Sequence, residues 1–175
     1  MSFDFFISAV ANGKRKRVPD SQKIDILGRY IENAPTYFGE YSADDIEFPG
    51  DEYVEISGDG FFNENDDDGI MFVSRGGFPK SFFKMLFDLC NEAGYCVEIP
   101  DERLHIGLPP SLEPEDVPRD IADEYELPVV YAKFNSPQEL EHIVGLSHSK
   151  WLKFVGLGHS KWLKFAKRIW RFWRK

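Results

Sequence analysis

Residues 79–99 read PKSFFKMLFDLCNEAGYCVEI, and this stretch predicts a helix that turns directly into a strand. Within Pro79–Ala93 the apolar side chains recur at helical spacing and form one stripe, made by Phe82, Phe83, Leu86, Leu89, Cys90 and Ala93. Gly94 stands where a left-handed cap ends a helix. Tyr95–Ile99 then predicts a strand, so a helix packed on a sheet is the expected nucleus of the fold.

Further strands are expected on both sides of this helix–strand unit. Short apolar or alternating runs bounded by turn residues predict them at Met1–Val10, Tyr53–Ser57, Gly69–Arg75, Leu104–Leu108 and Pro128–Phe134. Residues 109–127 are rich in proline and acid, which predicts a loop with a short helix. We expect these strands to form antiparallel groups in a mainly antiparallel sheet.

Two more helices are indicated by their start signals. Pro19-Asp20-Ser21 can begin a helix whose apolar face carries Ile24, Leu27 and Ile31, and Pro35 is expected to stop it. Ser136-Pro137-Gln138-Glu139 combines a capping serine, a first-turn proline and a capping-box glutamate. The sum predicts an α+β fold with two or three helices and a further amphipathic helix at the C-terminus.

The charge of the chain is divided very unevenly. Residues 1–143 carry all 30 acidic residues and only 12 of the 21 basic ones, a net charge of −18. Residues 144–175 carry the other nine basic residues and no acid. We therefore expect an acidic α+β domain over residues 1–143 and a basic helical tail over residues 144–175. An acidic body of this kind attracts basic proteins and repels nucleic acid.

Cysteine content and hydropathy bear on the compartment. Cys90 and Cys96 fit a reducing cytosol; two buried thiols are the favoured interpretation, and a disulfide between them is the alternative. No apolar run approaches the roughly 20 residues that span a bilayer. Asp4 interrupts the apolar N-terminus, so no secretion signal is expected. The predicted location is the cytoplasm, with membrane association through the tail as the alternative.

Catalytic and cofactor-binding patterns are not found in the sequence. No glycine-rich phosphate loop follows a predicted strand, and no nucleophile-elbow motif is present. None of the histidines His105, His142, His148 and His159 stands at a metal-ligand spacing. The acidic loop at residues 63–69 has Arg75 where a calcium loop requires glutamate. We expect a protein that is not an enzyme and holds no metal or cofactor.

Residues 44–68 are the predicted partner-binding face, because they contain many acids, interleaved aromatics and no lysine or arginine. The aromatics are Phe48, Tyr53, Phe61 and Phe62, with Tyr41 just before the stretch. The residues assigned to partner binding are Asp44, Asp45, Glu47, Asp51, Glu52, Tyr53, Glu64, Asp66, Asp67 and Asp68. A merely soluble acidic surface is the alternative interpretation.

These features resemble bacterial immunity proteins, which neutralise the toxin domains of polymorphic-toxin and contact-dependent growth inhibition systems. The opening MSFDFFISAVANGK, the helix after Gly76-Gly77 and the closing strand LPVVYAKF are similar to small bacterial proteins of that kind. The resemblance covers about residues 1–143 and implies a tight complex with a toxin domain, often a basic nuclease. It supplies no site residues, and the tail departs from it.

The tail contains a tandem repeat of eleven residues. Val144–Phe154 and Val155–Phe165 agree at ten of eleven positions, which a slippage duplication would produce. The residues assigned to membrane contact or self-docking are Trp151, Lys153, Trp162, Lys164, Trp170 and Trp173. Three functional interpretations remain open: an interfacial membrane helix, docking on the acidic body or on a second copy, and nucleic-acid binding. A terminal extension without function is the remaining alternative.

Overall fold

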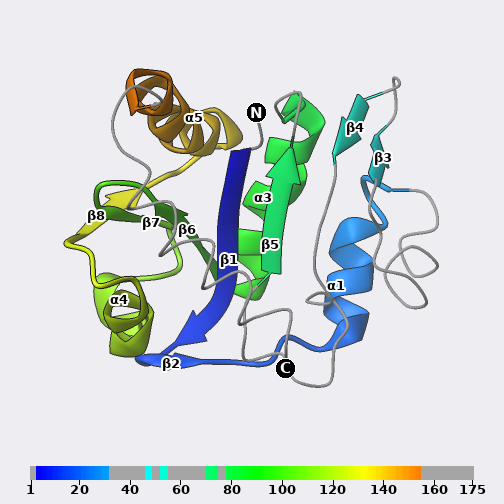
Figure 1. Cartoon of the computed structure of the whole chain (residues 1–175). Helices are drawn as coiled ribbons and strands as arrows, with labels where there is room; N and C mark the ends of the chain where they lie inside the picture. Colours follow the sequence, from blue (N-terminus) through cyan, green and yellow to red (C-terminus); the bar gives the residue numbers. More distant parts are fainter. Residues whose placement is uncertain (1–2, 32–45, 49–51, 55–69, 75–77, 155–175) are drawn as a thin grey trace, which may run out of the picture.

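The computed structural model describes residues 3–31, 46–48, 52–54, 70–74 and 78–154 of the 175-residue chain. It has a mixed α+β architecture, with a six-stranded and mostly antiparallel sheet and helices on both of its faces (Figure 1). The predicted fold class is therefore confirmed.

Strand β1 (Phe3–Ala11) is the central element of the sheet. One of its edges pairs antiparallel with β6 (Tyr95–Pro100). Its other edge pairs with β5 (Ile70–Ser74) along the first half of the strand and with the short β2 (Lys14–Arg15) at its end. The sheet order is β2-β1-β6-β7-β8, with β5 beside β1.

The last two strands of the sheet are parallel, which the sequence did not predict. Strand β7 (Leu104–Leu108) pairs antiparallel with β6 and parallel with β8 (Val129–Lys133). Parallel neighbours cannot be joined by a hairpin, so the connection must cross a face of the sheet. It does so through the 3₁₀ helix η2 (Pro114–Asp116) and helix α4 (Arg119–Tyr125). We call residues 109–128 the acidic crossover.

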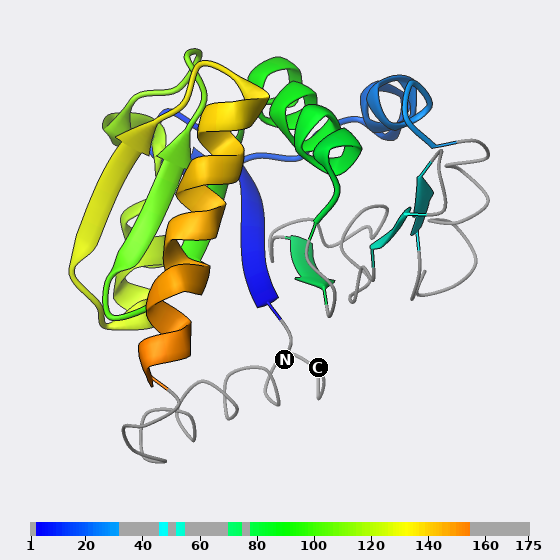
Figure 2. The same ribbon diagram turned by 90° about the horizontal axis from the view of Figure 1, so that it is seen from above.

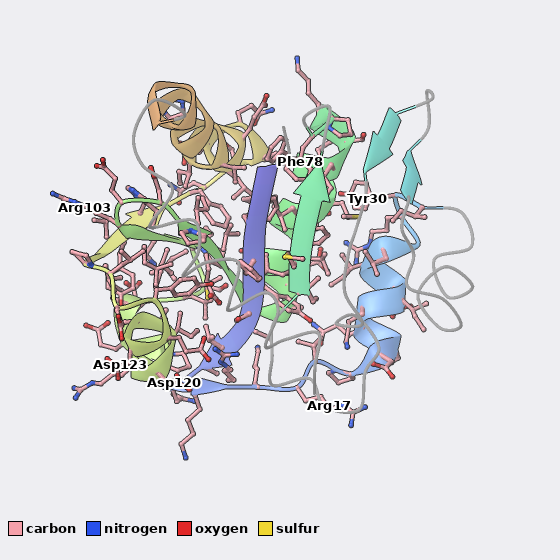
Figure 3. All side chains as sticks on the ribbon, in the orientation of Figure 1. Arg17, Tyr30, Phe78, Arg103, Asp120 and Asp123 are labelled. Atoms are coloured by element: carbon pink, nitrogen blue, oxygen red, sulfur yellow. The ribbon has the colours of Figure 1, made fainter. Side chains whose placement is uncertain are left out.

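Helix α3 (Lys80–Ala93) confirms the prediction made from its sequence. Every member of the predicted apolar stripe is buried, and Gly94 follows in the left-handed conformation with φ of +72°. Phe82 packs on Phe72 of β5 with ring centroids 5.1 Å apart and on Phe78 with centroids 4.5 Å apart. Helix α3 is thus joined to the sheet by aromatic rings, which bury much apolar area per residue (Figure 3).

Helix α1 (Asp20–Leu27) starts as predicted but ends earlier than expected. The chain leaves the helix at Gly28 and not at Pro35. The two residues that follow bind α3: the Arg29 guanidinium contacts both carboxylate oxygens of Glu92 at 2.6 and 3.0 Å, and the Tyr30 hydroxyl donates to Asp88 at 2.5 Å. The helix ends at Gly28, a residue that disfavours a helix interior by about 1 kcal/mol relative to alanine. Of the predicted face, Leu27 and Ile31 are buried and Ile24 is half-buried.

Helix α5 (Pro137–Phe154) begins at the predicted start signal. Ser136 Oγ accepts the backbone N–H of Glu139 at 3.2 Å, and the Glu139 carboxylate accepts the N–H of Asn135 at 2.7 Å. The helix includes the whole first copy of the repeat, Val144–Phe154, and the second copy lies outside the described residues.

The two faces of the sheet have separate apolar cores. Helices α1, α3 and α5 cover the first face, where Phe5, Ile7 and Val97 point from the sheet. The acidic crossover covers part of the second face, where Ile121 of α4 packs with Cys96 and other sheet residues. Strands β6, β7 and β8 therefore lie between α5 and α4 (Figure 1). Among the described helices, none combines the length and apolarity needed to cross a membrane.

A separate hairpin is formed by β3 (Ile46–Phe48) and β4 (Glu52–Val54). It belongs to the stretch that the sequence predicts as the partner-binding face. The expected strand there was Tyr53–Ser57, and the described strand covers Glu52–Val54.

The left-handed cap of α3 can be tested by Gly94→Ala. A Cβ at this position strains the backbone and lies 2.5 Å from Lys16 Nζ, so we expect a loss of about 1–2 kcal/mol in the free energy of unfolding. The matched control is Gly145→Ala in α5, where a Cβ meets nothing within 4 Å and alanine favours the helix by up to about 1 kcal/mol. Urea unfolding measures both, and equal changes in the two variants would contradict the assignment.

Candidate functional site

The structure describes three of the ten predicted partner-binding residues. Glu47 lies in β3, and Glu52 and Tyr53 lie in β4. Glu47 is the cross-strand partner of Tyr53, whereas Glu52 pairs with Phe48 in the next row. The hairpin therefore brings one predicted acid directly opposite the predicted aromatic. The other seven lie outside the described residues: Asp44, Asp45, Asp51, Glu64, Asp66, Asp67 and Asp68.

Of the predicted tail residues, Trp151 and Lys153 fall in the last turns of α5. Trp162, Lys164, Trp170 and Trp173 lie outside the described residues. The assignment of these side chains to a membrane or to self-docking therefore stays a prediction.

The acidic crossover is the densest acidic surface in the described part of the chain. Residues 113–126 contain seven carboxylates and one base, Arg119. The carboxylates belong to Glu113, Glu115, Asp116, Asp120, Asp123, Glu124 and Glu126. The sequence predicts a proline- and acid-rich loop with a short helix here, and α4 is that helix. The sequence shows the high density of acidic residues in this segment, but it does not predict that the segment crosses a face of the sheet.

Three of the seven carboxylates fix the crossover to the sheet. Asp116 accepts the backbone N–H groups of Asn12 and Glu113 at 3.0 and 2.9 Å, which joins η2 to the turn between β1 and β2. These hydrogen bonds hold the pKa of Asp116 below its ordinary value. Glu124 pairs with Arg15 of β2 at 3.2 Å. Glu113 pairs with Lys133 of β8 at 3.0 Å, and the same ammonium group donates to the carbonyl of Leu112.

The remaining carboxylates are not used for attachment. Within the described part, no ion pair or side-chain hydrogen bond involves the other four, and all four are exposed: Glu115, Asp120, Asp123 and Glu126. Asp123 lies on the outer side of α4, whereas Asp120 lies at the start of the helix, where it lines a hollow with Lys14 and Arg15 of β2 (Figure 3). The crossover thus presents unpaired negative charge on a segment whose own position is fixed.

Beneath α4, one aromatic side chain connects the helix to the sheet. The ring of Tyr125 meets Phe6 of β1 edge-on with centroids 6.5 Å apart, and its hydroxyl donates to Glu98 Oε2 of β6 at 3.2 Å. Glu98 is only 2% exposed. A carboxylate this deeply buried must be hydrogen-bonded to be tolerated. Neither the burial of Glu98 nor its partner was predicted from the sequence.

Glu98 belongs to a row of residues that crosses the second face. The registers align Met71, Phe6, Glu98, Ile106 and Tyr131 on successive strands from β5 to β8. Tyr131 ends the row at β8 and is 42% exposed. The second face therefore offers an exposed aromatic ring beside the acidic crossover.

A shallow hollow of about 570 Å³ lies between the β1–β2 turn and the start of α4. Its walls carry both signs of charge, from Lys14, Arg15 and Arg119 and from Asp120 and Glu124. Such a lining favours neither an anion nor a cation. The basic run Lys14–Arg17, which begins in β2, is partly neutralised here by the Arg15–Glu124 pair.

The two cysteines are buried thiols, as predicted, and form no disulfide. They lie in the separate cores of the two faces, Cys90 with α3 and Cys96 under the acidic crossover. Burial raises the pKa of both thiols far above the ordinary value, so neither is a thiolate near neutral pH. In the described part, no group of three or more potential metal ligands is found.

Comparison with family models, curated proteins and solved structures gave no match to this chain.

The Tyr125–Glu98 contact can be tested by Tyr125→Phe. Removal of the hydroxyl takes a donor from a buried carboxylate, so we expect a loss of about 1–3 kcal/mol in the free energy of unfolding. The matched control is Tyr131→Phe on the same face, where the change should stay within about 0.5 kcal/mol. Similar values for the two variants would show that the buried contact contributes little.

Asp116→Asn tests the attachment of η2 through the pH dependence of stability. Because the folded-state pKa of Asp116 is lowered, its contribution is complete above the ordinary aspartate pKa of about 3.9 and is lost as the pH falls through the folded-state value. We expect the variant to be less stable by about 0.5–1 kcal/mol at pH 7. In urea unfolding across this range, the difference from wild type should shrink below about pH 4. A difference that is constant with pH would contradict the prediction.

Proposed function

We propose that this protein is a non-enzymatic immunity protein that binds and neutralises a basic bacterial toxin domain in the cytoplasm. The observation that supports the proposal best is the acidic crossover, which presents unpaired carboxylates on a segment fixed to the sheet. The resemblance of residues 1–143 to immunity proteins points in the same direction.

A surface of this kind suits a basic partner for two physical reasons. Clustered negative charge accelerates the diffusional encounter with a positively charged protein. Because Asp116, Glu113 and Glu124 already hold the crossover in place, binding would cost little further ordering of its backbone. Tyr131 adds an exposed aromatic ring of the type that contributes strongly to protein interfaces.

A nuclease domain is the favoured class of toxin. Nucleases need basic surfaces because they bind the phosphate backbone, and a row of carboxylates competes for the same surface. The predicted acidic stretch at residues 44–68 remains a second candidate face for this partner. The two faces differ in their residues, so mutation can distinguish them.

The proposal is tested first by finding the partner. The N-terminally tagged chain would be purified at moderate salt from the organism that encodes it, and the co-purifying protein identified by mass spectrometry. We expect a stoichiometric basic chain that arrests bacterial growth when expressed alone and is harmless when co-expressed with this protein. Absence of growth arrest by every stoichiometric partner would overturn the proposal.

The face is tested by reversing charge on α4. With the toxin domain in hand, Asp120→Lys with Asp123→Lys should lower the association rate constant by about tenfold at low salt and by less at high salt. Asp25→Lys, an exposed aspartate of α1 on the first face, is the matched control. Asp66→Lys with Asp67→Lys and Asp68→Lys tests the other face. A loss confined to this last variant would exclude the acidic crossover as the toxin-binding surface.

A further inference from the structure

Helix α5 is longer than the strand that precedes it. Its 18 residues span about 27 Å, whereas the five residues of β8 span about 17 Å. The first turns of α5 pack on the core through Leu140 and Val144, so the excess length lies at its C-terminal end. Figure 2 shows this end projecting past the strands.

The end of α5 lies at the same end of the sheet as the C-terminus of α4. Helix α5 follows β8 and returns antiparallel to it, so Phe154 lies toward the start of β8 (Figure 2). The start of β8 directly follows the last residues of the acidic crossover, since Val129 comes three residues after Glu126. The chain therefore leaves α5 beside the end of the sheet where the crossover finishes.

Residues 155–175 are long enough to pass from the first face to the second. Twenty-one residues extend about 30 Å as a helix and more than twice that as an extended chain. A layer packed on either face of a sheet lies about 10 Å from the sheet, so about 20 Å separates the layers on its two faces. The distance around the end of the sheet thus poses no obstacle.

The chemistry of residues 155–175 is complementary to the second face. They contain seven lysines and arginines, no acid and three tryptophans. The acidic crossover supplies the unpaired carboxylates of Asp120, Asp123 and Glu126, and Tyr131 supplies an exposed ring for stacking with tryptophan or arginine. Docking would also relieve the self-repulsion of a body with a net charge of −18.

We propose that residues 155–175 dock on the acidic crossover of the same molecule and occupy the surface that a basic partner would bind. The tail is then a resident competitor, and a toxin must displace it. That last clause rests on the proposed function, whereas the docking itself does not.

Zero-length cross-linking of the full chain tests the docking without any partner. A carbodiimide joins a lysine amine to a carboxylate only where the two are in contact. We expect intramolecular cross-links from Lys161, Lys164 or Lys167 to Asp120, Asp123 or Glu126 in the monomer, identified by mass spectrometry, and their loss at 0.5 M salt because ion pairs at a surface are screened. Cross-links to residues 44–68 only, cross-links only between copies, or none to the crossover would overturn the proposal.

Tryptophan fluorescence provides the second readout, because all four tryptophans lie in residues 151–173. In the full chain, Asp120→Asn with Asp123→Asn and Glu126→Gln should shift the emission to longer wavelength and increase quenching by acrylamide. The control Asp25→Asn should change neither the emission wavelength nor the quenching.

The docking is contradicted if the triple variant shows no change in emission or quenching. The docking is also contradicted if anionic vesicles shift the tryptophan emission to shorter wavelength by the same amount in the wild type and in the triple variant. The tail of the wild type would then be free to bind lipid. Toxin binding that persists in either case would leave the proposed function intact.

Discussion

The pairing of β1 with three other strands is the constraint on which the rest of the structure depends. Its two edges are occupied by β6 on one side and by β5 and β2 on the other. Phe5 and Ile7 from this strand are fully buried against the helices of the first face, and Phe6 meets Tyr125 on the second. The helices on the first face and the acidic crossover on the second face therefore both pack on β1 or on a strand paired with it.

The position of the acidic surface follows from strand direction. Because β7 and β8 are parallel, the chain between them must cross a face of the sheet, and the first face is already covered by α1, α3 and α5. The acidic crossover is consequently laid over the second face and attached there by three of its own carboxylates. The other carboxylates of the crossover are not used in this attachment and are available to bind a partner. Topology thus decides which acids are structural and which are available.

Features set by nearby residues could be predicted from the sequence. The stripe and the glycine cap of α3 and the start of α5 follow from residues a few positions apart, and all of these predictions are confirmed. Features set by distant partners could not. The residues after α1 bind Glu92 and Asp88 of α3, which are distant in sequence. The parallel pairing of β7 and β8 leaves no local signal. The sequence alone does not distinguish Glu98, which is buried beneath Tyr125, from an exposed strand glutamate. For the candidate site, the sequence shows the high density of acidic residues at 44–68 and 109–127. It does not show which acids form ion pairs, because their partners are distant in the sequence.

The long sequence separation between β1 and its partner β6 has a consequence for synthesis. Ser8 pairs with Cys96, which lies 88 residues further along, so half the length of the chain must leave the ribosome before the centre of the sheet can close. Such high contact order slows folding, and an aromatic strand that waits for its partner is exposed to aggregation in the meantime.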